Sequence, residues 1–180
     1  LYFPSTILGT NEIAPLTMAA AYAAVSNRGV YCSPVSIDKV ILRRDGSELN
    51  VPKTQCSQAV SEEVALAMVQ ALKPVITGGT GARANPGGPV PLAGKTGTTD
   101  NRIHTWMIGV SSEVATATWV GNVSGQVRQG GKRVNGNEVT IIRHEIWRQI
   151  MRAVNEKYGG TNWPAPDAKY LSAPSIAIPT

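Results

Sequence analysis

The sequence predicts an α+β fold in which an antiparallel β-sheet is flanked by helices. Three observations lead to this prediction. Apolar residues recur at helical spacing in three stretches, at about 15–26, 61–73 and 142–154. Between the last two stretches, β-branched runs joined by short polar turns are typical of antiparallel strands. The chain has 180 residues, of which 42% are hydrophobic, and this is enough for one globular domain with a sizeable core.

Two buried helices are predicted in the first half of the chain. The first begins at Pro15, because proline is favoured in the first helical turn, and residues 27–29 supply its stop. The second is capped by Ser61, carries two glutamates in its first turn and ends at Pro74. The apolar stripe of this second helix consists of Val64, Met68, Val69 and Leu72.

Strands are predicted in two regions. Short β-branched runs over 30–44, followed by the turn sequence at 44–47, indicate a first hairpin. Farther along, residues 90–98 predict a single strand that leads into a second hairpin, formed by 105–110 and 114–120. The strand at 90–98 and the second hairpin should lie side by side in one sheet.

Glycine and proline mark the irregular segments. Residues 78–89 predict a loop, which either borders a substrate site or is a plain connector. Residues 121–136 predict a surface excursion, and the last helix ends at the glycines 159–160. The apolar face expected for this helix consists of Ile142, Ile146, Trp147, Ile150 and Val154. A domain of residues 1–160 is then followed by a proline-rich tail, 161–180, expected to be an extended segment or linker.

The composition excludes several classes of protein. The net charge is +5, but the basic residues are not interleaved with aromatic ones, which favours a solvated basic face over nucleic-acid binding. They are Arg128, Lys132, Arg133, Arg143, Arg148 and Arg152. No segment has the pattern of a membrane span or a signal peptide. Cys32 and Cys56 fit no zinc spacing, and they form either one disulfide or two unpaired, packed thiols.

The most informative segment is Lys95-Thr96-Gly97-Thr98. The lysine supplies a fixed positive charge, and two threonines at i and i+2 place their hydroxyl groups on one side of a strand. The glycine leaves room for another chain to lie alongside. This combination predicts a site for a carboxylate-bearing acyl substrate that binds as an extended peptide.

A nucleotide-binding site is one alternative, because a glycine directly before Lys95 and a threonine directly after it match the end of a phosphate-binding loop. The first glycine of that motif would have to stand at Pro89. The residues after Lys95 also favour strand and turn over the helix that must receive the phosphate. Nucleotide binding is therefore disfavoured.

A Ser-His-Asp hydrolase is another alternative. Neither His104 nor His144 stands near a nucleophile-elbow sequence, and both are expected to be surface residues. The tryptophans of the second hairpin, Trp106 and Trp119, are expected in the core of the sheet and not at a ligand site. No metal or cofactor is predicted.

Further motifs occur in a fixed order around the lysine segment. They are Leu8-Gly9-Thr10-Asn11-Glu12, the alanine-rich helix through Tyr22, Gly29-Val30-Tyr31, Asp45-Gly46, Gly78-Gly79-Thr80-Gly81, Ala93 to Thr99, Trp106 with Gly109, and Trp119-Val120-Gly121. In this order they resemble the C-terminal part of the transpeptidase domain of class A, bifunctional penicillin-binding proteins. The resemblance covers the chain from about Leu8 to Tyr158, and it is more specific than a Lys-Thr-Gly sequence alone.

The resemblance implies the penicillin-binding protein fold, present here in part, and acyl transfer on peptidoglycan. A serine would attack the penultimate carbonyl of a stem peptide ending in D-Ala-D-Ala, and an amine of a neighbouring stem would accept the acyl group. β-Lactams would acylate the same serine. The reaction would take place on the extracytoplasmic face of the bacterial cell membrane.

The resemblance also assigns roles to the lysine segment. Lys95 would bond the serine of the second family motif and support proton transfer. Thr96 and Thr98 would bind the terminal carboxylate, and the Thr98 N–H would be one oxyanion donor. Gly97 would let the substrate backbone pair with this strand.

The family's nucleophile motif, S-x-x-K, and its second motif, S-x-N, lie far upstream of the lysine motif. Only 94 residues precede Lys95, so both motifs are expected in an upstream segment that completes the site. Ser36 and Lys39 match S-x-x-K formally, but they lie in a strand-like stretch, where residues three apart point in opposite directions. This is interpreted as a chance match.

Two further features depart from the family pattern. Residues 126–140 lack the glycine-alanine-proline approach to the last helix, and an unusual rim of the site is expected there. The glycosyltransferase domain and the membrane anchor of the family also have no counterpart in the sequence. Because the nucleophilic serine is missing, a noncatalytic cell-wall-binding or structural module with the same fold is the alternative to a D,D-transpeptidase.

Overall fold

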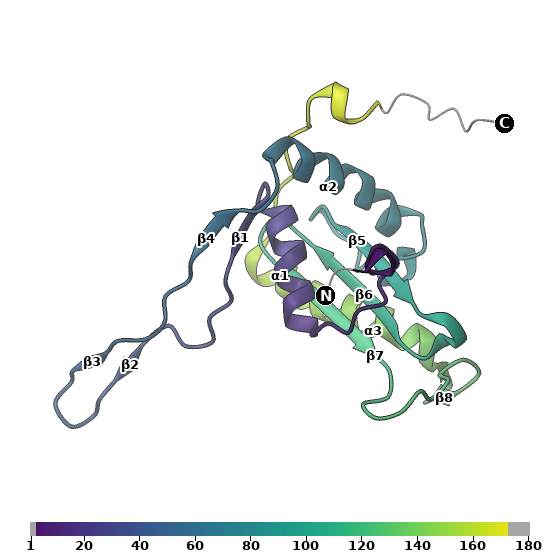
Figure 1. The fold of residues 1–180 in the computed structure, drawn as a ribbon, viewed down its shortest axis with the longest axis horizontal. Coiled ribbons are helices and arrows are strands. Elements are labelled where there is room, and N and C mark those ends of the chain that lie inside the picture. Colours follow the sequence, from purple (N-terminus) through teal and green to yellow (C-terminus); the bar gives the residue numbers. More distant parts are fainter. Residues whose placement is uncertain (1–2, 173–180) are drawn as a thin grey trace.

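A computed structural model of the protein describes residues 3–172 and confirms the α+β fold (Figure 1). The main sheet is antiparallel, with strand order β5-β6-β7. Its strands are β5 (Ala93–Thr98), β6 (Thr105–Val110) and β7 (Ala115–Val120). Helices α1 (Pro15–Ser26) and α2 (Glu62–Thr77) cover one face, and α3 (Val139–Tyr158) covers the other. The predicted strand and the hairpin after it are therefore confirmed, although β5 begins at Ala93 and not at residue 90.

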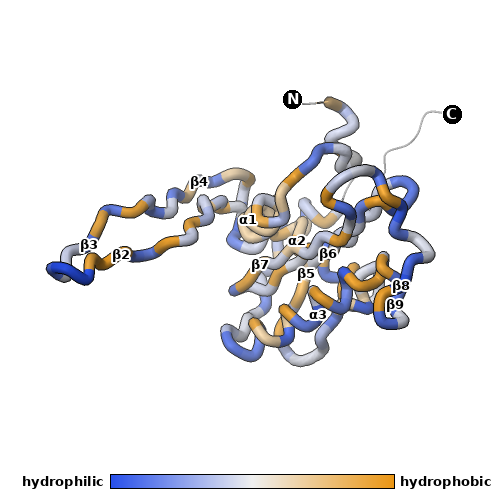
Figure 2. The backbone as a smooth tube through the Cα atoms, turned by 90° about the horizontal axis from the view of Figure 1, so that it is seen from below, coloured by the Kyte–Doolittle hydropathy of each residue, from blue (hydrophilic) through white to orange (hydrophobic). Residues whose placement is uncertain are grey.

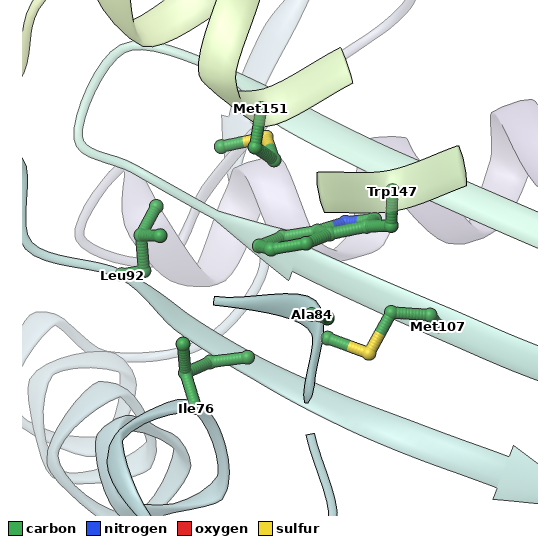
Figure 3. Packing of buried hydrophobic residues seen from close by; sticks show 6 residues of the cluster. All are labelled: Ile76, Ala84, Leu92, Met107, Trp147 and Met151. Carbon is green, nitrogen blue, oxygen red and sulfur yellow. The ribbon is translucent and has the colours of Figure 1, made fainter. Parts of the chain in front are cut away.

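The core on the α3 face is centred on Trp147, which is fully buried (Figure 3). Its indole lies over the sheet at Gly109, where an added Cβ atom would come within 2.6 Å of Cζ2 of the ring. Gly94 is the partner of Gly109 on β5, and a Cβ atom added there would come within 3.0 Å of Cδ1 of Ile76, so the two glycines leave room for the indole and for Ile76 side by side. The packed cluster consists of Ile76, Ala84, Leu92, Met107, Trp147 and Met151.

A second core lies on the other face of the sheet. It consists of Leu66, Val69, Ala93, Val110 and Trp163. Trp163 comes from the predicted tail, and its Nε1–H donates to the carbonyl oxygen of Ser26 at 3.1 Å. The division at residue 160 stays a prediction, but the first residues after it are packed against α1 and α2.

A long two-stranded arm projects from this body (Figures 1 and 2). At its base β1 (Val30–Cys32) pairs with β4 (Cys56–Gln58), and near its tip β2 (Val40–Ile41) pairs with β3 (Glu48–Leu49). The predicted hairpin is confirmed at the tip. Cys32 and Cys56 form a disulfide across the base, which decides between the two alternatives for the cysteines.

The buried faces of two helices differ in part from the predicted ones, although Val69 and Trp147 are fully buried as expected. In α2, Val64 and Met68 are 38% and 42% exposed. The prediction that this helix ends at Pro74 was also wrong, because it continues to Thr77. A proline inside a helix removes only one hydrogen bond, and burial of Ile76 favours the additional turn. The residues of α2 that are buried are Ala65, Leu66, Val69 and Ile76.

The face of α3 is set by Trp147. A helix that inserts this residue also buries those about one turn away on either side, which here are His144 and Met151. The expected positions Ile146 and Ile150 lie to the side and are each 40% exposed. His144 is only 6% exposed, so its prediction as a surface residue was wrong.

The hairpin tryptophans are also less buried than predicted. Trp106 and Trp119 pair across β6 and β7, with ring centroids 6.5 Å apart, and each is partly exposed. His104 stacks on Trp119 at 5.8 Å. The pair is therefore a surface-facing aromatic ladder and not part of the two cores.

The excursion at 121–136 runs into a short hairpin of β8 (Arg133–Val134) and β9 (Asn137–Glu138), which leads directly into α3. No helix among residues 3–172 combines the length and the apolar character needed to cross a bilayer. In the described part of the chain, α1 with α2, the main sheet and α3 form the three layers of a body from which one arm projects.

Replacing Gly109 with alanine tests the contact with Trp147. The added methyl group would collide with the indole and with the carbonyl oxygen of Ala93 at 2.7 Å, so Gly109→Ala should lower the free energy of unfolding by about 1–3 kcal/mol. Gly78→Ala is the matched control, because nothing lies within 4 Å of its added Cβ, and its effect should stay within about 0.5 kcal/mol. Urea unfolding measures both, and equal midpoints would contradict the close packing of the indole on Gly109.

Burial of His144 predicts a pH dependence of stability. Burial lowers the pKa of this imidazole below its usual value, and the nearby charge of Arg143 lowers it further. As the pH falls, the unfolded chain therefore binds a proton at this imidazole before the folded chain does. The contribution of neutral His144 to the free energy of unfolding is complete above about pH 6.5 and is lost as the pH falls below that value. Between pH 7.5 and 5.5, the free energy of unfolding measured with urea should fall less steeply in His144→Gln than in the unaltered chain. An unchanged slope in the variant would contradict the assignment.

Candidate active site

The lysine segment lies on an edge strand. β5 pairs only with β6 among the described residues, and Lys95 to Thr98 face Ile108 to Thr105 in antiparallel register. The other side of β5 has no strand partner within residues 3–172. An unpaired edge is where an extended peptide adds to a sheet through its main chain.

The direction of the backbone groups on β5 follows from its last hydrogen bond. Thr99 N–H donates to the carbonyl oxygen of His104 at 3.0 Å, on the side of β6. Because N–H groups alternate along a strand, that of Gly97 also points toward β6, whereas those of Thr96 and Thr98 point to the free edge. The Thr98 N–H is therefore open to a ligand lying along this edge.

The two threonine side chains share one face of β5, as predicted, and each has a partner. Thr96 Oγ1 lies 2.8 Å from Thr80 Oγ1, which comes from the glycine-rich loop before the strand. Thr98 Oγ1 accepts a hydrogen bond of 3.2 Å from Nη1 of Arg143, in the second turn of α3. Each of the two hydroxyl groups thus has a hydrogen-bond partner, one in the glycine-rich loop and the other on α3.

Lys95 is exposed, and its side chain is on the opposite face of β5 from the threonines. Its Nζ donates to the carbonyl oxygen of Thr96 at 3.0 Å. Among the described salt bridges none involves Lys95, so its positive charge is not neutralised within residues 3–172.

The contact with the neighbouring strand gives a structural reason for a glycine at position 97, in addition to the predicted role in substrate binding. A Cβ atom at this position would lie 3.2 Å from Cβ of Trp106 on the neighbouring strand, which is tighter than side chains normally pack. The glycine therefore lets Trp106 stand directly beside β5. That it also makes room for a substrate backbone stays a prediction.

The formal S-x-x-K match lies far from β5, in the arm. Ser36 is at a bend and not in a helix, and Lys39 forms a salt bridge of 2.9 Å with Glu48. The helical turn that would bring a serine and a lysine together is absent at these residues. The pair therefore contributes nothing to the surface around Thr98.

Sequence reasoning missed two residues of the site, Thr80 and Arg143. The glycines around Thr80 gave a signal, because they predicted a loop that could border a substrate. Arg143 gave none, since an arginine in an amphipathic helix usually lies in solvent. Within residues 3–172 no three histidine, cysteine, aspartate or glutamate side chains gather as a metal site requires.

A polar groove of about 650 Å³ lies between α3 and the short 3-10 helix at Ala82–Ala84. Glu145 lies in it and forms salt bridges with both Arg83 and Arg148. The groove contains no residue of β5, so it is separate from the threonine pair. The Glu145 carboxylate, two residues beyond Arg143 on α3, is thus already paired with two other arginines.

Comparison with known proteins identifies this arrangement. The family described as penicillin binding protein transpeptidase domain matches residues 5–152. The chain belongs to this family. Penicillin-binding protein 1A of Aquifex aeolicus is 32% identical over 163 residues, which are 90% of this chain and 21% of that protein. Penicillin-binding protein 1A/1B of Bacillus subtilis is 31% identical over 175 residues, which are 89% of this chain and 18% of the relative.

Solved structures of the family share the fold. The penicillin-binding protein PonA1 of Mycobacterium tuberculosis superposes with a TM-score of 0.80 at 25% identity, over 98% of this chain and 48% of that one. The same protein has been determined in complex with penicillin V, with a TM-score of 0.79. This transpeptidase-domain chain thus spans about a fifth of the length of the curated relatives and about half of the PonA1 chain.

The orientation of β5 can be tested by hydrogen exchange. The amides of Thr96 and Thr98 should exchange at least about tenfold faster than those of Lys95 and Gly97, because only the latter pair donates within the sheet. Residue-resolved exchange followed by NMR measures all four in one experiment. The reverse order would mean that β5 pairs with β6 in a register shifted by one residue.

Proposed function

We propose that this chain is the C-terminal portion of a D,D-transpeptidase domain that cross-links peptidoglycan stem peptides. The observation that carries the proposal is the free edge of β5, which combines an open Thr98 N–H, two hydroxyl groups and an unneutralised lysine. Membership of the transpeptidase family supports it. An upstream segment with the S-x-x-K and S-x-N motifs would supply the nucleophile.

In this proposal the stem peptide lies along the edge of β5 as an added strand. Thr96 and Thr98 hold its terminal carboxylate, which places the penultimate carbonyl beside the Thr98 N–H. That N–H and the N–H of the nucleophilic serine then stabilise the oxyanion as the serine attacks. The new bond is an ester to the serine, and the bond that breaks is the amide to the last D-alanine.

Two proton transfers accompany the reaction. The departing D-alanine needs a proton on its nitrogen, and the serine must lose one. Lys95 would act by bonding the serine of the second motif and keeping the site positive, so that this proton relay runs toward the leaving amine. An amine of a neighbouring stem peptide then attacks the ester and forms the cross-linking amide, while the ester bond breaks and a proton from the amine returns to the serine oxygen. No metal or cofactor is required for any of these steps.

β-Lactams would form the same ester, and the complex of the related PonA1 with penicillin V supports this. The Cys32–Cys56 disulfide supports a location on the extracytoplasmic face of the cell membrane, because disulfides persist in oxidising compartments. The proposed partners are therefore stem peptides ending in D-Ala-D-Ala, β-lactams and the upstream segment of the same domain.

Labelling with a fluorescent penicillin tests the proposal. The isolated chain should not be acylated, whereas the chain joined to its upstream segment should be. Lys95→Ala in the joined protein should slow acylation by about a hundredfold or more, since it removes a group that assists proton transfer. Lys39→Ala is the matched control and should have no effect, because Lys39 lies in the arm.

Two results would contradict the proposal. Covalent labelling of the isolated chain at Ser36 would place the nucleophile in the arm. A joined protein that carries both upstream motifs but is not acylated would favour a noncatalytic wall-binding module. The site of labelling is read by mass spectrometry of the tryptic peptides.

A further inference from the structure

Arg143 is a basic side chain that packs directly against the threonine pair. Its Nη1 donates to Thr98 Oγ1 at 3.2 Å. It is only partly exposed, and its Nε is buried without a hydrogen-bond partner among the described residues. Most of its donor groups thus have no partner within residues 3–172.

No acidic side chain within residues 3–172 forms a salt bridge with Arg143. The two carboxylates nearest to it along the chain have other partners. Glu145 binds Arg83 and Arg148, and Glu138 binds Arg102. A partly buried guanidinium without a counter-ion is costly unless an anion reaches it.

The contact with Arg143 also fixes the direction of the Thr98 hydroxyl. A guanidinium group has donors and no acceptor, so Thr98 Oγ1 must accept this hydrogen bond. The hydrogen of the hydroxyl is then free to donate elsewhere. Because Thr98 is exposed on the free-edge strand, this hydrogen can reach an acceptor on a ligand, such as a carboxylate oxygen.

We infer that Arg143 is the cationic residue of the carboxylate-binding site on β5. It supplies the charge that attracts the terminal carboxylate of the stem peptide, donates to it directly and keeps the Thr98 hydroxyl oriented as a donor. Lys95 lies on the opposite face of the strand, where it serves the proton relay. This inference rests on the proposed function and names the residue that selects a substrate with a free terminal carboxylate.

The inference separates two kinds of ligand. An extended peptide with a terminal carboxylate would gain a charge-assisted hydrogen bond from Arg143, whereas the same peptide with a terminal amide would not. Removing Arg143 should therefore weaken binding of the first ligand only. A purely structural role for Arg143 would weaken both ligands equally.

The test uses the chain labelled with ¹⁵N and two probes, N-acetyl-D-Ala-D-Ala and its C-terminal amide. Titration followed at the Thr98 amide by NMR should show that Arg143→Ala weakens binding of the acid roughly ten- to a hundredfold and leaves binding of the amide unchanged. Arg143→Lys should fall between, because lysine keeps the charge but lacks the planar fork. The indole signal of Trp147 verifies that each variant is folded.

Arg152→Ala is the matched control. It removes one positive charge from the same helix at an exposed position more than two turns away, so it should bind the acid like the unaltered chain. If Arg143→Ala binds the acid as tightly as this control, the inference is overturned and the proposed function stands. If the unaltered chain binds neither probe, β5 holds no carboxylate site and the inference is overturned, whereas acylation of the joined protein tests the proposed function separately.

Discussion

The packing of Trp147 on Gly109 is the contact on which the rest of the structure depends. The indole reaches the sheet because Gly109 has no side chain, and Gly94, its partner on the adjacent strand, makes room for Ile76 in the same way. This close approach sets both the distance of α3 from the sheet and the rotation of α3 about its axis. With Trp147 inserted, Arg143 lies one turn toward the N-terminus of α3 and reaches Thr98.

The second constraint is the register of the edge strand. In a β-strand both the side chains and the backbone donors alternate with a period of two. A single register therefore places two hydroxyl groups on the α3 face, the lysine on the other face and the Thr98 N–H at the free edge. A shift of the register by one residue would move every one of these groups to the opposite side, because each group's direction depends on whether its residue stands at an odd or an even position along the strand. The hydrogen bond from the Thr99 N–H to the His104 carbonyl oxygen, at the end of the strand, fixes this register.

The strands and the loop before β5 could be predicted from sequence because turn residues and β-branched runs are local signals. The helix faces could be predicted only in part, and Val69 and Trp147 are buried as expected. Val64 and Ile150 match an apolar stripe, yet they are 38% and 40% exposed, because packing against distant elements determines which side of each helix is buried. The lysine and the two threonines were singled out from their spacing, and their roles in binding and catalysis stay predictions. Arg143 was not singled out, because its contact with Thr98 joins two segments 45 residues apart.

The disulfide at the base of the arm has a consequence for the integrity of the chain. Cys32 and Cys56 enclose the exposed tip, including β2 and β3, in a covalent ring. A protease that cuts the peptide backbone once inside this ring leaves the two pieces joined through sulfur. The helices before and after the arm would then stay attached to the same sheet, and the body would persist as a nicked, two-chain molecule until a reductant separates it.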